Sequence, residues 1–216
     1  MGLKVTQVRY MIHFNTELFP LYHHEITEGL PKIGYELVET WPKVSVMTSR
    51  VYGTGEVARK GKCSFFLSAD TQQVGVIDDS IESAIKNFDE ILKMFKEEYN
   101  ITFNNYLKYY SYVGDYIYYT KKPAYETLSN KFTLSQIDVI NNILKDKMSL
   151  YQINLGVSGL KVNSENWYDI SITPGYERNN AFIIRIVMRN PKEENILKYM
   201  KESEEKIKTI IKFIEE

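Results

Sequence analysis

Two long helical stripes, each preceded by a run of strand-like segments, constrain the fold of this chain most strongly. Apolar residues recur at intervals of three and four over 81–95 and again over 196–214. This spacing places them along one side of a helix. Asp79 or Ser80 is the expected cap at the start of the first stripe, with Glu82 at the capping-box position. Each helix therefore needs an apolar surface to cover, and the preceding segments are suited to supply it.

Alternating polar and apolar residues predict strands ahead of each stripe, because successive side chains of a strand point to opposite faces. The expected strands of the first half are 4–14, 44–52, 63–68 and 72–77. Those of the second half are 106–119, with a bulge or bend at Gly114, and then 150–158, 167–173 and 181–189.

A shorter helix is expected after the first strand of each half. Asn15 or Thr16 fits the cap of the first one, Pro20 fits its first turn, and Pro31 marks its end. Thr133 caps the second. Each half then has the order β-α-β-β-β-α.

We therefore predict an α+β fold made of two such pseudo-repeats, residues 1–100 and 101–216, joined in one compact unit. Their strands would form a largely antiparallel sheet with the helices on one face. An antiparallel sheet tolerates one solvated face, so the opposite face is expected to remain open.

This element order resembles the two-repeat fold of the TATA-box-binding protein family, and it is similar to effector-binding domains of the gyrase-inhibitor type. The resemblance covers most of the chain, but only in element order. It implies a curved antiparallel sheet backed by helices. The intercalating phenylalanine pairs and the basic concave face of the TATA-binding family are not identifiable in this sequence, so no residue role is transferred.

Composition narrows the class of protein. Hydrophobic residues make up 44% and charged residues 25% of the 216 residues, which is ordinary for a globular chain. The net charge of −1 disfavours a dedicated nucleic-acid binder, which relies on neutralising phosphates. The many lysine, glutamate and isoleucine residues suit a thermophile, although an AT-rich genome gives the same bias.

The cysteine content, the first residues and the lengths of the apolar runs predict a cytoplasmic protein. Cys63 is the single cysteine, so an intrachain disulfide is excluded, as is typical of a reducing compartment. The first residues alternate and lack the apolar core of a signal peptide. No apolar run reaches the roughly 18 residues of a membrane span, so we expect no membrane association.

A tyrosine-rich segment is the most unusual local composition. Seven tyrosines fall within 106–119. On a strand, the candidate contact residues Tyr110, Tyr112, Tyr116 and Tyr118 share one face. They are suited to a protein interface or to stacking on nucleic-acid bases, and equally to aromatic pairing within the sheet.

A glycine-rich basic segment, 53–62, supplies the second set of candidate contacts, Arg59, Lys60 and Lys62. Small residues and cations together are suited to phosphate. The segment lacks the spacing of a phosphate-binding loop and no helix follows it, so a hairpin loop with solubilising charges is the simpler interpretation.

The histidines and the cysteine are weaker candidates. His23 and His24 are neighbours that diverge on a helix, and His13 has no evident partner, so the spacing fits metal ligation poorly. Cys63 alternates with Phe65 and Leu67, which favours a core position over a nucleophile.

Three functions remain open. We favour a non-enzymatic binding or interaction protein that uses the open face of its sheet to hold a protein partner or a second copy of itself, with no cofactor or metal. The second is nucleic-acid binding through the same face. Its expected contacts are Arg50, Arg59, Lys60, Lys62, Lys108 and Arg185. The third is a metal-dependent or RNA-processing hydrolase that uses His13 or His24.

Overall fold

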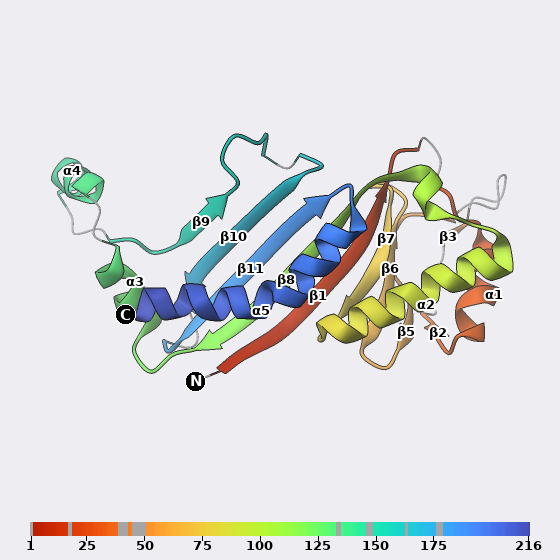
Figure 1. The fold of residues 1–216 in the computed structure, drawn as a ribbon, viewed down its shortest axis with the longest axis horizontal. Coiled ribbons are helices and arrows are strands. Elements are labelled where there is room, and N and C mark those ends of the chain that lie inside the picture. The colour runs from red at the N-terminus through yellow and green to blue at the C-terminus, as the bar shows by residue number, and fades with distance from the viewer. Residues whose placement is uncertain are drawn as a thin grey trace.

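One nine-stranded antiparallel sheet organises the chain in the computed structural model (Figure 1). The structure describes residues 2–16, 19–38, 43–44, 51–132, 135–145, 149–162, 164–175 and 179–216. Across the sheet the strands are β2 (Glu36–Leu37), β5 (Thr54–Lys60), β6 (Cys63–Ser68), β7 (Gln73–Asp78), β1 (Gly2–Phe14), β8 (Leu107–Tyr119), β11 (Ala181–Asn190), β10 (Trp167–Pro174) and β9 (Ile153–Gly156). The predicted α+β class and the antiparallel sheet are confirmed.

The remaining elements are one small ribbon and the helices. A separate two-stranded ribbon pairs β3 (Lys43–Val44) with β4 (Val51–Tyr52). A 3₁₀ turn covers Phe103–Tyr106. The α-helices are α1 (His23–Lys32), α2 (Ile81–Tyr99), α3 (Ala124–Lys131), α4 (Ser135–Leu144) and α5 (Glu193–Glu215).

Two long strands, β1 and β8, form the centre of the sheet. Their register sets Tyr10 opposite Tyr112 and His13 opposite Tyr109. The ladder is irregular near Val5/Gln7 and again at His13/Phe14, whereas Gly114 pairs regularly on both sides. The bulge expected at Gly114 is therefore wrong. A Cβ there would overlap the side chains of Tyr112 and Tyr116, so the glycine makes room for two large rings.

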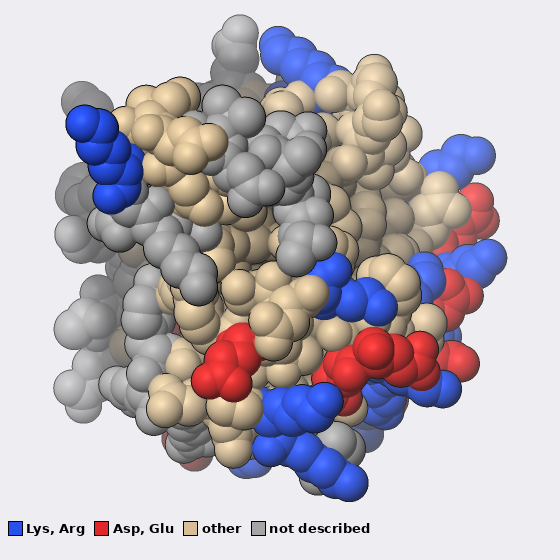
Figure 2. Space-filling view, turned by 90° about the vertical axis from the view of Figure 1, so that its left-hand side faces the viewer, with Lys and Arg blue, Asp and Glu red and all other residues tan. Residues whose placement is uncertain are grey.

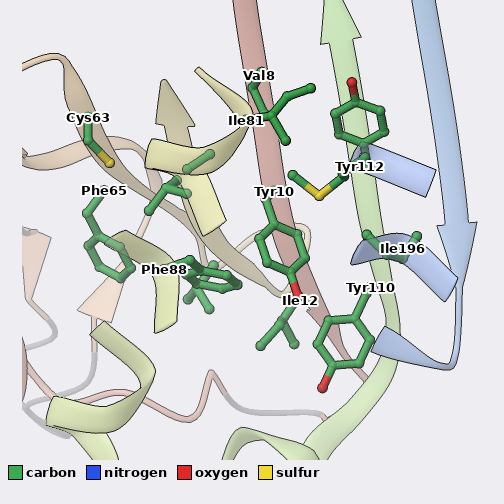
Figure 3. Close-up of a cluster of buried hydrophobic side chains, with 14 of the residues drawn as sticks. Val8, Tyr10, Ile12, Cys63, Phe65, Ile81, Phe88, Tyr110, Tyr112 and Ile196 are labelled. Atoms are coloured by element: carbon green, nitrogen blue, oxygen red, sulfur yellow. The ribbon is translucent and has the colours of Figure 1, made fainter. Parts of the chain in front are cut away.

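The helices α2 and α5 lie against the same face of the sheet (Figure 1). Ser80 caps α2 by accepting a hydrogen bond from the Ser83 amide at 3.4 Å, as the capping signal predicts. In Figure 3, Tyr10 points from the sheet toward Phe88 of α2, and Tyr112 lies above Ile196 of α5. Both tyrosines are fully buried. The core of the molecule therefore fills the space between this face and the two helices.

Several elements differ from the expectation. The first helix begins at His23, beyond Pro20, and runs through Pro31, because a proline removes an amide but can still be accommodated near a helix end. The glycine-rich segment is not a loop: 54–60 forms strand β5, which pairs with β6 except at a register shift around Val57. Gly53 and the turn before Cys63 lie outside the ladder. Helix α3 was not expected. Arg50 and the middle of the strand expected over 44–52 lie outside the described residues.

The strand order has the same form on both sides of the β1–β8 pair. The last strand of the first half, β7, pairs with β1, and the last strand of the second half, β11, pairs with β8. The outer strands then run back in sequence to β5 on one side and β9 on the other. That the two halves are repeats of one another stays a prediction.

The two edges of the sheet differ in length and chemistry. The first is β2, and the second is β9, which lies at the end of the molecule that faces the viewer in Figure 2. Within the described ranges, no helix is long and apolar enough to cross a membrane.

Candidate functional site

The candidate site is the face of the sheet opposite α2 and α5, which we call the open face. Side chains alternate across each strand, so the register identifies the residues that share this face. At its centre they are Arg9, Met11, His13, Tyr109, Ser111, Val113, Asp115, Arg185, Val187, Arg189, Trp167 and Asp169.

His13 anchors one end of this face. Its ring stacks on Tyr109 with the centroids 4.3 Å apart, and its Nε2 lies 2.8 Å from Oγ of Ser111. Burial lowers the pKa of His13 to about 4, and the positive charges of Arg189 and Lys108 act in the same direction. The imidazole is therefore neutral at pH 7 and serves as a hydrogen-bonding group.

Arg189 extends the same cluster to the next strand. Its guanidinium carbon lies 5.6 Å from the ring centroid of Tyr109, a cation–π arrangement. Trp167 is opposite Arg189 in the ladder, is 7% exposed, and donates from Nε1 to a carboxylate oxygen of Asp169 at 2.5 Å. A histidine, a tyrosine, an arginine and a tryptophan thus form one continuous aromatic and cationic strip.

Arginines concentrate on the open face. Each of the four in the strands of the main sheet projects there, namely Arg9, Arg59, Arg185 and Arg189. Arg185 forms a two-pronged ion pair with Asp115, with Nε 2.6 Å and Nη2 3.1 Å from its oxygens. That pairing, through its hydrogen bond and its charge, raises the pKa of Arg185.

The predicted tyrosine contacts lie elsewhere. Tyr110, Tyr112 and Tyr116 do share one face, but it is the face under the helices, and they are at most 4% exposed. Tyr118 lies on the same side and is half-buried. The prediction that Tyr110, Tyr112 and Tyr116 are surface contacts is wrong, because their rings fill the core. The hydroxyls of Tyr112 and Tyr116 bond to each other and to Ser203 of α5.

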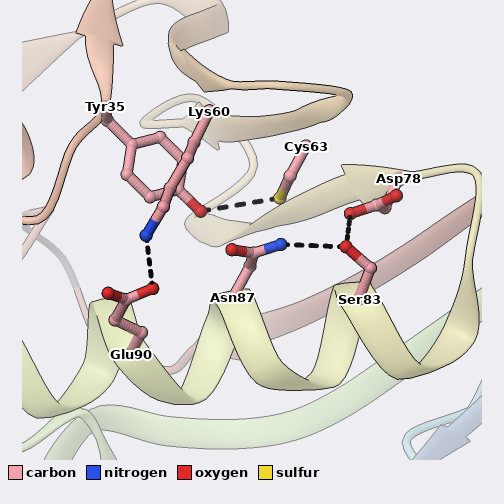
Figure 4. Close-up of polar contacts among 7 residues, drawn as sticks. All are labelled: Tyr35, Lys60, Cys63, Asp78, Ser83, Asn87 and Glu90. Atoms are coloured by element: carbon pink, nitrogen blue, oxygen red, sulfur yellow. Dashed lines mark hydrogen bonds and ion pairs between the residues drawn. The ribbon is translucent and has the colours of Figure 1, made fainter.

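The predicted basic contacts are separated by the pleat of β5. Arg59 lies on the open face and is paired with Glu56, whose oxygen accepts from Nη2 at 2.7 Å. Lys60 points the other way and meets Glu90 of α2 at 2.7 Å (Figure 4). Lys62 is paired with Asp79 at 2.5 Å. Since each cation has a carboxylate, these residues do not form a free phosphate cradle.

Cys63 lies beside these charges but is sequestered. It is 1% exposed, and its sulfur lies 3.5 Å from the hydroxyl of Tyr35 (Figure 4). Burial raises the pKa of the thiol to about 12. A thiol with so little thiolate is a poor nucleophile, in agreement with the core position expected from sequence.

The three histidines do not lie together. His13 is on the open face, whereas His23 and His24 are on α1, where the ring of His24 lies 6.0 Å from that of Tyr99. Among the residues described, no three side chains of metal-ligand type come together.

Sequence reasoning missed Tyr109, Ser111, Trp167 and Arg189. Alternation along β1 puts Arg9, Met11 and His13 on one face, but their neighbours on β7 and β8 are distant in sequence. Ser111, for example, is 98 positions from His13. The chain matches no known protein-family description and no curated protein sequence, so no function is transferred from a relative.

Proposed function

We propose that this protein is a non-enzymatic interaction protein whose open face binds a protein partner. The single observation that carries the proposal is the segregation of arginine onto this face, beside the half-buried Tyr109. Met11 and Trp167 share the face but are themselves buried, at 9% and 7% exposed. Arginine, methionine and aromatic residues are the types enriched at protein interfaces, whereas lysine is depleted there. Of the three lysines in the main-sheet strands, Lys60 points to the helices, whereas Lys4, opposite Ile117, lies on the open face.

The charge balance of the face favours a protein over a nucleic acid. Arg59 and Arg185 are neutralised by Glu56 and Asp115, and the net charge of the chain is −1. Nucleic-acid binding draws most of its free energy from unpaired cations that displace counterions from phosphates. Paired arginines beside apolar Val113 and Val187 are better suited to a mixed protein surface.

The His13–Ser111 pair gives weaker support to an enzyme. A nucleophilic serine needs a base that is itself oriented by a third group. Across the described part of the chain, no carboxylate is hydrogen-bonded to the ring of His13. The pair is better explained as a fixed polar contact at the centre of an interface.

Site-specific photocrosslinking tests the proposal. A photoreactive residue is placed at Ile183, which is 44% exposed on the open face, and in a matched variant at Lys96, which is exposed on α2. In lysate of the native cells, we expect a discrete protein adduct from position 183 alone. Arg185→Ala should reduce its yield at least about threefold, because an interfacial arginine contributes on the order of 1 kcal/mol or more.

The same crosslinking experiment includes a control variant and distinguishes a protein partner from a nucleic acid. Lys93→Ala removes an exposed cation from α2 and should leave the adduct unchanged. Equal adducts from both positions, or none from position 183, would refute the proposal. An adduct abolished by nuclease would favour the nucleic-acid alternative instead.

Two further proposals concern the chain as a whole. The matching strand order on either side of β1 and β8 supports an origin by duplication of residues 1–100 and 101–216. The single, deeply buried cysteine supports a place in a reducing compartment such as the cytoplasm.

A further inference from the structure

Exposed apolar side chains gather at the β9 end of the sheet. Among the described residues, nine of the eleven exposed large apolar side chains belong to 125–162 or to the end of α5, including Leu155, Val157, Val162 and Phe213. In Figure 2, which faces this end, uncharged atoms extend across the middle and charged atoms lie mainly toward the right and lower rim. Exposed apolar side chains gathered in this way mark an interaction site.

The edge strand β9 offers unpaired backbone at the same end. Within the described part of the chain it pairs with β10 alone. Residues 148–160 contain neither a charged side chain nor a proline, so the edge has none of the usual protection against pairing with another strand. The opposite edge, β2, is only two residues long and carries Glu36. Strand β9 is therefore the longer edge and the one without a charged residue.

An apolar groove of about 590 Å³ adjoins β9 on the side of the helices. Leu155 of β9, Ile172 of β10, and Ile210 and Phe213 of α5 contribute to its walls. Phe213 is 56% exposed and Leu155 is 55% exposed, so the groove is open to solvent in a single chain.

Helix α4 projects beyond this edge. Figure 1 shows it outside β9, apart from α2 and α5. Its last residues, Ile143 and Leu144, are 72% and 57% exposed. Among the described elements it packs extensively on none. An amphipathic helix in this position lacks the apolar surface that would stabilise it.

We propose that a second copy of this chain covers this end. The β9 strands of the two copies pair antiparallel across a two-fold axis, and α4 of each copy lies over the groove of the other. A two-fold contact uses the same surface twice, so a single contact covers the edge, the groove and the helix. A small apolar ligand would fill only the groove and would leave the β9 edge and α4 uncovered, which is why the observations favour a second copy.

Molar mass in solution tests this dimer. For the full chain, light scattering coupled to size-exclusion chromatography should give a dimer that dissociates on dilution. Leu155→Lys places a charge in the proposed interface and should weaken the dimer at least about tenfold, since burying an unpaired charge costs more than 1.4 kcal/mol. Phe213→Lys tests the groove in the same way. Tyr106→Lys, at a position 42% exposed outside this end, is the matched control and should dimerise normally.

Circular dichroism should show native secondary structure for all three variants. A wild-type chain that is monomeric at every concentration, or a dimer that neither lysine variant weakens, would overturn the proposal. Native mass spectrometry that finds a monomer carrying a small apolar molecule would also overturn it.

A cysteine at the edge tests the strand pairing directly. Asn154→Cys would lie near its own equivalent across the proposed axis, within disulfide reach of it. Because Cys63 is 1% exposed, the new cysteine is the one available to an oxidant. Mild oxidation should give a covalent dimer with Asn154→Cys and none with Tyr106→Cys; no covalent dimer from position 154 would contradict β9 pairing. Asn154, opposite Ser171, is on the open-face side of β9, but Leu155 and Phe213 line the groove on the helix side. The molar-mass variants therefore leave the open face unchanged, and this dimer and the proposed function can fail separately.

Discussion

The hydroxyl of Tyr10, at the middle of β1, donates a hydrogen bond to Oε1 of Glu193 at 2.6 Å, at the first residue of α5. This contact joins the central strand of the first half to the closing helix of the second. Burial, and then the bond to Glu193, hold the pKa of Tyr10 far above its usual range, so the hydroxyl remains a donor at any ordinary pH.

Tyr10→Phe should therefore destabilise the fold without creating a cavity. Hydrogen bonds to charged groups contribute more than neutral ones, so we expect the free energy of unfolding to fall by about 1–2 kcal/mol. Urea unfolding followed by circular dichroism measures it. Tyr106→Phe, at an exposed position, should change the same quantity by less than about 0.5 kcal/mol. Equal effects of the two variants would show that the Glu193 contact contributes nothing.

His13 predicts a specific loss of stability in mild acid. Its pKa is about 4 in the folded protein against 6.5 for the free side chain. Between these values the unfolded chain binds a proton that the folded chain does not, so the free energy of unfolding decreases as the pH falls through this window. A shift of this size corresponds to a decrease of at most about 3 kcal/mol.

His13→Gln isolates that contribution, because glutamine keeps a polar contact for Ser111 but does not titrate. Urea unfolding at several pH values should show a flatter pH dependence for the variant between pH 6.5 and pH 4. Parallel curves for the two proteins would mean that His13 is accessible to protons in the folded state.

Gly114 should not tolerate a side chain. A Cβ at this position would overlap the rings of Tyr112 and Tyr116, which are fully buried and cannot move away freely. Gly114→Ala should lower the free energy of unfolding by about 1–3 kcal/mol, the range for overpacking a core. Gly2→Ala is the control, since no atom lies within 4 Å of its Cβ position. A neutral effect of Gly114→Ala would contradict the tyrosine packing described.

Cys63 should be unreactive in the folded protein. Its pKa of about 12 and 1% exposure leave almost no accessible thiolate. A thiol reagent such as dithionitrobenzoate should label the native chain only at the rate of unfolding, whereas Lys96→Cys, on the exposed side of α2, should react immediately. Rapid labelling of Cys63 itself would show that the β6–α2 contact opens locally.

Patterns with strong periodicity allowed much of this fold to be predicted from sequence. The stripe of α2 and the alternation of β6, β7 and β8 gave their boundaries closely, because one side of each is buried. Asn15, Thr16 and Pro20 are good cap and first-turn residues, so they predict too early a start for α1, which begins at His23. Gly55 in β5 and the flanking Gly53 and Gly61 predict a loop, and they conceal the buried Val57 and Ala58.

The site was harder to predict than the fold. Alternation grouped Tyr110, Tyr112 and Tyr116 correctly but could not tell which face of β8 the helices cover, since Val113 and Ile117 make the other face apolar as well. The contacts of His13 depend on the β1–β8 register, which joins segments 98 residues apart at Ser111. No local pattern contains that information.

Cysteine accessibility along β11 tests the open face most directly. Ile183 is 44% exposed and the Arg185 side chain 55% exposed, whereas Ile184 and Ile186 are fully buried. Single cysteines at these four positions, in a chain whose own thiol is buried, should label with a thiol reagent rapidly at 183 and 185 and slowly at 184 and 186. Slow labelling at all four positions would mean that a second layer covers this face, and the proposed contact surface would not exist.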